Sequence, residues 1–136
     1  MEEPLIQGGK HIGKVLKEEG VEYVFGIAGG HIFALMVGFG SADIKLVHCR
    51  HEQAAGYAAD AYARASGKVG VCFGTAGPGM TNLASALAQA YYAKSPVVAF
   101  FGQHSTSEDG RMALQEGFGE SVMLDQDDVC ALDAAD

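Results

Sequence analysis

The chain has 136 residues, the size of one ordinary domain, and a formal net charge of −8. Residues 120–136 hold six acids and no base, so the other 119 residues carry 11 acids against 9 bases, and this nearly neutral body argues against binding to nucleic acid or an anionic membrane. No apolar secretory segment follows Met1, no stretch approaches the ~18 apolar residues of a membrane span, and three scattered cysteines suit a reducing compartment, so we expect a soluble cytoplasmic protein.

Short, continuously apolar strands alternate with helices along residues 5–101. Strands of this kind are typical of a parallel sheet that is buried on both faces, with helices as the crossover connections. We therefore predict a doubly wound α/β domain, with a parallel sheet flanked by helices on both faces. The expected elements are helix 5–19, strand 23–25, helix 31–37, strand 44–47, helix 52–66, strand 69–73, helix 80–94 and strand 97–101.

The pattern of elements ends after Gly102. Residues 103–119 are polar and glycine-rich and are predicted to form a loop. We therefore divide the chain into a domain of residues 1–119 and an acidic linker, or the truncated start of a next domain, at residues 120–136. Within the last predicted helix, 80–94, the apolar face is expected to consist of Met80, Leu83, Ala84, Leu87, Ala88 and Tyr91.

Three polar or glycine-rich stretches directly follow predicted strands, at residues 26–31, 48–52 and 74–82. In doubly wound sheets, ligands bind outside the carboxyl ends of the strands. Because all three stretches lie at such ends, we expect them to converge on one site.

The third stretch has the spacing of a phosphate-binding loop, Gly-x-x-x-x-Gly-Met-Thr, between a strand and a helix. Met80 stands where that loop has its lysine, so the charge that would reach a phosphate is absent, which argues against a nucleotide hydrolase. Gly77-Pro78-Gly79 is either a simple tight turn or a rigid backbone edge whose N–H and C=O groups could bond a flat heterocycle.

The second stretch, His48-Cys49-Arg50-His51-Glu52, combines residue types that bind metals. Its His-x-x-His spacing at a strand end does not place both imidazoles on one helical face, so we expect no metal site here. Glu52 is either a helix-start carboxylate stabilised by the helix dipole or, at the edge of a buried alanine-rich helix, a proton-transfer group.

Two segments carry a family resemblance: residues 50–64, RHEQAAGYAADAYAR, and residues 74–82, GTAGPGMTN. They resemble the N-terminal, pyrimidine-binding domain of thiamine diphosphate-dependent enzymes of the acetolactate synthase type. The wider group includes benzaldehyde lyase-like, oxalyl-CoA decarboxylase-like and 2-hydroxyacyl-CoA lyase-like enzymes. The likeness covers roughly residues 5–120 and implies the thiamine diphosphate-binding fold.

The resemblance implies that Glu52 is the catalytic acid/base. In the family, the matching glutamate hydrogen-bonds N1′ of the aminopyrimidine and drives the ring into the imino tautomer, whose 4′-nitrogen takes the thiazolium C2 proton. The family's Gly-x-Pro-Gly turn matches residues 26–30, but Ala28 replaces the proline, which loosens that turn. The implied site residues are Glu52, Gly29, Gly77, Pro78, Gly79 and Asn82 toward the cofactor, and His31 and Gln115 toward the substrate.

In the family, a separate domain with a Gly-Asp-Gly motif holds the diphosphate and Mg²⁺, and Glu108-Asp109-Gly110 is the nearest match here. We therefore expect a diphosphate-binding domain or subunit as a partner, with no metal ligands in this chain. Active sites in the family lie between subunits, so we also expect a homodimer or larger assembly that pairs through the 80–94 helix.

The implied reaction is decarboxylation or carboligation of a small 2-oxo acid, with acetolactate formation as the nominal choice and a decarboxylase or acyl-CoA lyase as close alternatives. Two further readings stay open. One is a non-catalytic assembly or regulatory subunit with the same fold, which the intact Glu52 disfavours. The other is an unrelated nucleotide-binding domain, which Met80 disfavours.

Overall fold

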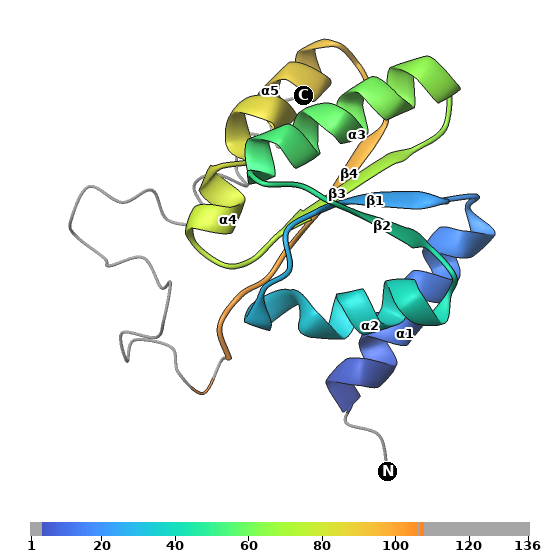
Figure 1. The fold of residues 1–136 in the computed structure, drawn as a ribbon, viewed down its shortest axis with the longest axis vertical. Helices are drawn as coiled ribbons and strands as arrows, with labels where there is room; N and C mark the ends of the chain where they lie inside the picture. The colour runs from blue at the N-terminus through green and yellow to red at the C-terminus, as the bar shows by residue number, and fades with distance from the viewer. Residues whose placement is uncertain (1–3, 106, 108–136) are drawn as a thin grey trace, which may run out of the picture.

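The computed structural model describes residues 4–105 and residue 107. At its centre is a sheet of four parallel strands in the order β2-β1-β3-β4 (Figure 1). The prediction of a parallel α/β sheet is therefore confirmed. The strands are β1 (Tyr23–Gly26), β2 (Lys45–His48), β3 (Gly70–Gly74) and β4 (Val97–Phe101).

Helices cover both faces of this sheet (Figure 1). One layer consists of α1 (Pro4–Glu18) and α2 (Phe33–Ser41), and the opposite layer of α3 (Glu52–Ser66) and α5 (Ala84–Tyr92). Two short elements, the 3-10 turn η1 (Gly30–Ile32) and the single-turn helix α4 (Pro78–Thr81), follow β1 and β3. None of the helices in the described part of the chain is long and apolar enough to cross a membrane.

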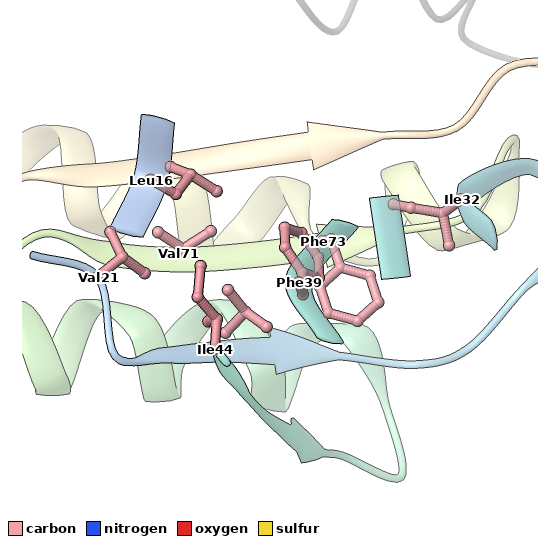
Figure 2. Packing of buried hydrophobic residues seen from close by; sticks show 8 residues of the cluster. Leu16, Val21, Ile32, Phe39, Ile44, Val71 and Phe73 are labelled. Carbon is pink, nitrogen blue, oxygen red and sulfur yellow. The ribbon is translucent and has the colours of Figure 1, made fainter. Parts of the chain in front are cut away.

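Each face of the sheet has its own hydrophobic core, since side chains of successive strand residues point to opposite faces. In β3, Val71 and Phe73 join the core under α1 and α2, whereas Cys72 joins the core under α3. Figure 2 shows the first core, where the rings of Phe39 and Phe73 lie with their centroids 5.6 Å apart. Its buried members are Leu16, Val21, Val24, Ile32, Phe39, Ile44, Val71 and Phe73.

The helix predicted at 80–94 is wrong as a single element: it is divided into α4 and α5 at Asn82 and Leu83. The backbone N–H of Leu83 bonds the carbonyl of Met80, three residues back, so the turn is tighter than an α-helix. This tight turn rotates the face that follows. On α5 the buried residues are Ala86 and Ala90, and the predicted Ala88 and Tyr91 are exposed.

The helix expected at 31–37 also differs, because η1 precedes a longer helix, α2, that ends at Ser41. The predicted domain boundary at residue 119 and the predicted segment 120–136 lie outside the described residues and stay predictions.

Candidate functional site

The candidate site lies at the topological switch point of the sheet. From β1 the chain crosses to β2 on one side, whereas β3 pairs with β1 on the other side. Connections from the carboxyl ends of β1 and β3 therefore diverge, and the crevice between them is where doubly wound sheets bind ligands. The segments after β1, β2 and β3 are the three stretches that the sequence singled out.

Side-chain contacts join these three stretches. His31 Nδ1 lies 3.3 Å from Thr75 Oγ1, which links the segment after β1 to the segment after β3. Asn82 Nδ2 donates a 3.0 Å hydrogen bond to Glu52 Oε2, which links the segment after β2 to the same third segment. The prediction that the stretches converge is confirmed by these contacts.

Glu52 is the first residue of α3 and its side chain is half-buried. The helix N-terminus favours a carboxylate at this position. The bond from Asn82 occupies Oε2, and among the described residues Oε1 has no hydrogen-bond partner. Asn82 can reach Glu52 because it sits in the tight turn between α4 and α5. The site thus presents a carboxylate with one oxygen fixed and the other available.

The neighbours of Glu52 in sequence fix the start of α3. His51 is the N-cap residue, with extended backbone angles, and its Nδ1 accepts a hydrogen bond from the Gln53 backbone N–H at 3.2 Å. The Gln53 side chain in turn donates to Ser85 Oγ on α5 at 2.8 Å. The first turn of α3 is therefore held both by its own cap and by the neighbouring helix.

Gly77, Pro78 and Gly79 form the entry to α4. Gly77 has φ 62° and ψ −113°, a conformation that suits glycine, and Pro78 occupies the first helical turn. The Gly77 carbonyl accepts from the N–H groups of Met80 and Thr81. Of the two readings of this stretch, a tight turn or a backbone edge that bonds a heterocycle, this carbonyl favours the turn, because the first turn of α4 already uses it. Pro78 itself is exposed.

Gly29 lies so close to Thr75 that a Cβ added at Gly29 would be 2.6 Å from the Thr75 Cβ. His31 is half-buried and packs on Gly102, where an added Cβ would lie 2.7 Å from the His31 Cβ. Gly102 follows β4 and its N–H bonds the carbonyl of Gly74. The segments after β1, β3 and β4 are therefore packed together around His31 and Thr75.

The cysteines near the site are not activated as nucleophiles. Burial raises the pKa of the Cys72 thiol to about 12, as expected for a small core residue. Burial also raises the pKa of Cys49, and a hydrogen bond with the Gly26 backbone opposes this shift. Among residues 4–105 and 107, no group of three His, Cys, Asp or Glu side chains is arranged to hold a metal ion.

Sequence reasoning missed Thr75 and His51. Thr75 belongs to the glycine-rich stretch that the sequence singled out, but its contact with His31 depends on how β1 and β3 pair. His51 was missed because rules for helix caps favour Ser, Thr, Asp and Asn. Gln115, expected near the substrate, lies outside the described residues.

A surface hollow lies elsewhere, between α1 and the end of α2. The two helices that line it, α1 and α2, are each followed by a strand, β1 and β2. The hollow therefore lies toward the amino-terminal ends of the strands, opposite the edge of the sheet that carries Glu52. Its cations already have partners within the chain: for example, Lys14 pairs with Glu18 at 3.8 Å and Lys17 donates to the carbonyl of Asp43. We assign no ligand to this hollow. Its lining residues are Lys10, Lys14, Lys17, Glu18, Ser41 and Ala42.

Comparison with known proteins points to one family. Residues 6–126 match the family described as "Thiamine pyrophosphate enzyme, N-terminal TPP binding domain". This match includes all the segments that meet around Glu52 and Thr75.

The relatives are named for different activities. The chain is 45% identical over 111 residues to a probable acetolactate synthase large subunit of Methanocaldococcus jannaschii, covering 82% of this chain and 19% of the relative. It is 45% identical over 109 residues to 2-hydroxyacyl-CoA lyase 2 of Danio rerio, covering 80% and 18%. It is 46% identical over 112 residues to an acetolactate synthase of Mycobacterium avium, covering 82% and 18%. The matched part is thus about one fifth of each relative's length.

Proposed function

The chain belongs to the thiamine pyrophosphate enzymes as an N-terminal TPP-binding domain, and we propose that it supplies the pyrimidine half of the active site, with Glu52 as acid/base. The observation that carries this proposal is the geometry of the Glu52 carboxylate. One oxygen is fixed by Asn82 at 3.0 Å, and the other has no partner among the described residues. A half-buried carboxylate with one available oxygen fits a ring nitrogen that must exchange a proton.

When bound, thiamine diphosphate supplies a thiazolium carbon that adds to a carbonyl and accepts the electrons that decarboxylation releases. Glu52 Oε1 would share a proton with N1′ of the aminopyrimidine. Asn82 would keep the carboxylate in one orientation, because its bond to Oε2 restricts rotation of the side chain. Proton transfer by a positioned side chain requires a distance of about 2.6–3.2 Å, so this orientation bears directly on rate.

The other predicted site residues are assigned by their place around Glu52. The helix α4 lies between Gly77, its N-cap residue, and Asn82, its C-cap residue. We propose that the backbone of Gly77, Pro78 and Gly79 lies along the pyrimidine ring. Gly29 lies against Thr75, and we propose that its lack of a side chain lets the segment after β1 approach Thr75 beside the cofactor. His31 would face the substrate, with Thr75 orienting its ring through the 3.3 Å contact.

The reaction is proposed to be decarboxylation or carboligation of a small 2-oxo acid, of the acetolactate synthase type. Relatives named as acetolactate synthases support this choice, and those named 2-hydroxyacyl-CoA lyase 2 support an acyl-CoA lyase as the alternative. A separate domain or subunit is proposed to bind the diphosphate and Mg²⁺, and the greater length of the relatives supports it, since this chain spans about one fifth of each.

A second copy of the chain is proposed to pack on the outer layer formed by α3 and α5. Tyr91 and Tyr92 lie at the end of α5 with exposed fractions of 47% and 83%, and Tyr57 on α3 is 36% exposed. Aromatic side chains on a surface are typical of protein interfaces. We also propose a reducing compartment such as the cytoplasm, which free thiols at Cys49 and Cys72 support.

Native mass spectrometry of the protein from its source, with thiamine diphosphate and Mg²⁺ present, tests this proposal. The expected result is a complex that contains bound cofactor together with a diphosphate-binding domain, on the same polypeptide or on a second one. A species without cofactor and without such a domain would contradict it, and would favour a non-catalytic assembly or regulatory role.

A further inference from the structure

We propose that His51 is a positioning residue for Glu52: its imidazole caps α3 through Nδ1 and fixes the turn from which Glu52 acts. This inference rests on the proposed function of Glu52. It assigns to His51 a role through the backbone of α3, without contact between its ring and the cofactor.

His51 is the N-cap residue of α3. His51 has φ −152° and ψ 141°, the extended backbone of an N-cap residue, and Nδ1 accepts from the Gln53 N–H at 3.2 Å. An acceptor nitrogen must offer a lone pair, and in this bond Nδ1 is the acceptor for the Gln53 N–H. A side chain without an acceptor atom at this place would leave the Gln53 N–H without its cap.

The cap holds the first turn of α3, which begins with Glu52. Residues 51, 52 and 53 are consecutive, and each makes a different bond that fixes the start of α3. His51 bonds the backbone, Glu52 accepts from Asn82 at 3.0 Å, and Gln53 donates to Ser85 at 2.8 Å. Because helix termini lack intrahelical partners for their first N–H groups, an uncapped first turn frays. Glu52 is the first residue of that turn and would be displaced with it.

Capping by His51 and direct ligand binding by its ring would use different nitrogens. Its side chain is exposed and Nδ1 is already used, so only Nε2 could bond a ligand. Asparagine places its Oδ1 where histidine has Nδ1, and it is a strong N-cap residue. Glutamine instead extends its amide to the position of Nε2. The two substitutions therefore distinguish the two nitrogens.

The experiment compares His51→Asn, His51→Gln and His51→Ala in the complete cofactor-loaded protein. One readout is hydrogen–deuterium exchange at the Gln53 amide, and the other is deuterium exchange at C2 of bound thiamine diphosphate. In His51→Ala, protection of the Gln53 amide is expected to fall about 2- to 30-fold, the effect of losing an N-cap. C2 exchange is expected to slow in the same variant, and His51→Asn should restore both rates.

Two results would overturn the proposal: unchanged Gln53 protection in His51→Ala, or restoration of C2 exchange by His51→Gln but not by His51→Asn. The second result would show that Nε2 acts directly. Glu52→Gln, measured alongside, separates this inference from the function on which it rests. If that variant exchanges C2 normally, the proposed role of Glu52 fails, while amide exchange at Gln53 still decides whether His51 caps the helix.

Discussion

At the residue scale, the proposed proton transfer depends on how the carboxylate of Glu52 is held. Glu52 and Asn82 are 30 positions apart in sequence and are brought to 3.0 Å by the packing of α3 against α5. That packing requires Gly56, because a Cβ there would lie 2.6 Å from the Cβ of Ala86. A glycine with no chemical role of its own therefore determines whether Asn82 reaches its partner.

Asn82→Ala should slow C2 deuterium exchange of bound thiamine diphosphate about 10-fold, since hydrogen bonds to charged groups contribute about 1.5 kcal/mol or more. The side chain of Glu52 would remain but would lose its fixed orientation. Thr81→Ala is the matched control, because Thr81 is exposed and adjacent. Equal rates in the Asn82 variant and in the control would show that the bond to Oε2 has no role in proton transfer.

The sequence predicted the site residues Glu52 and Asn82 through family resemblance, but it did not predict that they bond each other. It also missed Thr75 and the cap at His51. These contacts depend on strand pairing and on backbone angles at a helix start, and no local pattern encodes either. What a local pattern does encode is the order of strands and helices, since apolar runs and alanine-rich segments reflect burial directly.

At the element scale, glycines determine how closely helices approach. Gly9 and Gly13 on α1 and Gly38 on α2 lie where the two helices touch, and a side chain at any of them would collide with backbone of the other helix. Packing between elements also explains why the prediction of a single helix at 80–94 was wrong. Its composition favours a continuous helix, but the tight turn at Leu83 lets Met80 and Leu83 be buried while Asn82 points to Glu52.

Gly38→Ala should lower the free energy of unfolding by about 1–3 kcal/mol, because the new methyl group meets the Gly9 carbonyl, which cannot move without bending α1. Gly40→Ala, two residues further along α2, has open space and should raise stability by about 0.5–1 kcal/mol. Urea denaturation of both variants measures the difference. Similar effects in the two variants would contradict the close helix contact.

Asp60 on α3 gives the fold a predicted dependence on pH. It is fully buried, and its Oδ2 accepts from Arg64 at 2.7 Å and from Gln89 at 3.1 Å. The nearby Ser95 hydroxyl, Gln89 and Arg64 hold the pKa of Asp60 below its ordinary value of 3.8, although burial opposes them. Asp60 Oδ1 and Ser95 Oγ are both buried and have no hydrogen-bond partner among the described residues.

Because this pKa is lower in the folded chain than in the unfolded chain, the ionised group stabilises the fold above pH 3.8, and the effect is lost as pH falls through the folded pKa. Asp60→Asn should therefore be less stable than the wild type at pH 7, and the difference should shrink below pH 3.8. Thermal denaturation across this range measures it. Glu22→Gln, which removes an exposed carboxylate paired with Lys68, should change stability little. A difference for Asp60→Asn that is independent of pH would contradict the assignment.

At the scale of the whole molecule, the two helical layers differ in what they contribute to the fold and to the site. The α1–α2 layer is tied to the sheet by a core of large apolar side chains (Figure 2). The α3–α5 layer carries Glu52 and exposes aromatic side chains outward. An active site shared between subunits would use this second layer twice, for the carboxylate and for the contact with a second copy.

Tyr92→Glu should weaken association between copies roughly 30-fold, as expected when an aromatic residue central to an interface is lost. Tyr92 is 83% exposed, so the substitution should leave the fold intact. Val15→Glu on α1, which is 42% exposed in the opposite layer, is the control. Sedimentation velocity measures both. Loss of association in the α1 variant but not in the α5 variant would place the interface on the other layer.

The role of Glu52 is tested by deuterium exchange at C2 of thiamine diphosphate bound to the complete protein, compared between the wild type and Glu52→Gln. If Glu52 is the acid/base, the variant should exchange at least about 100-fold more slowly while still binding cofactor, in line with the usual contribution of a positioned proton donor or acceptor. Exchange at the wild-type rate with cofactor bound would show that another group moves this proton.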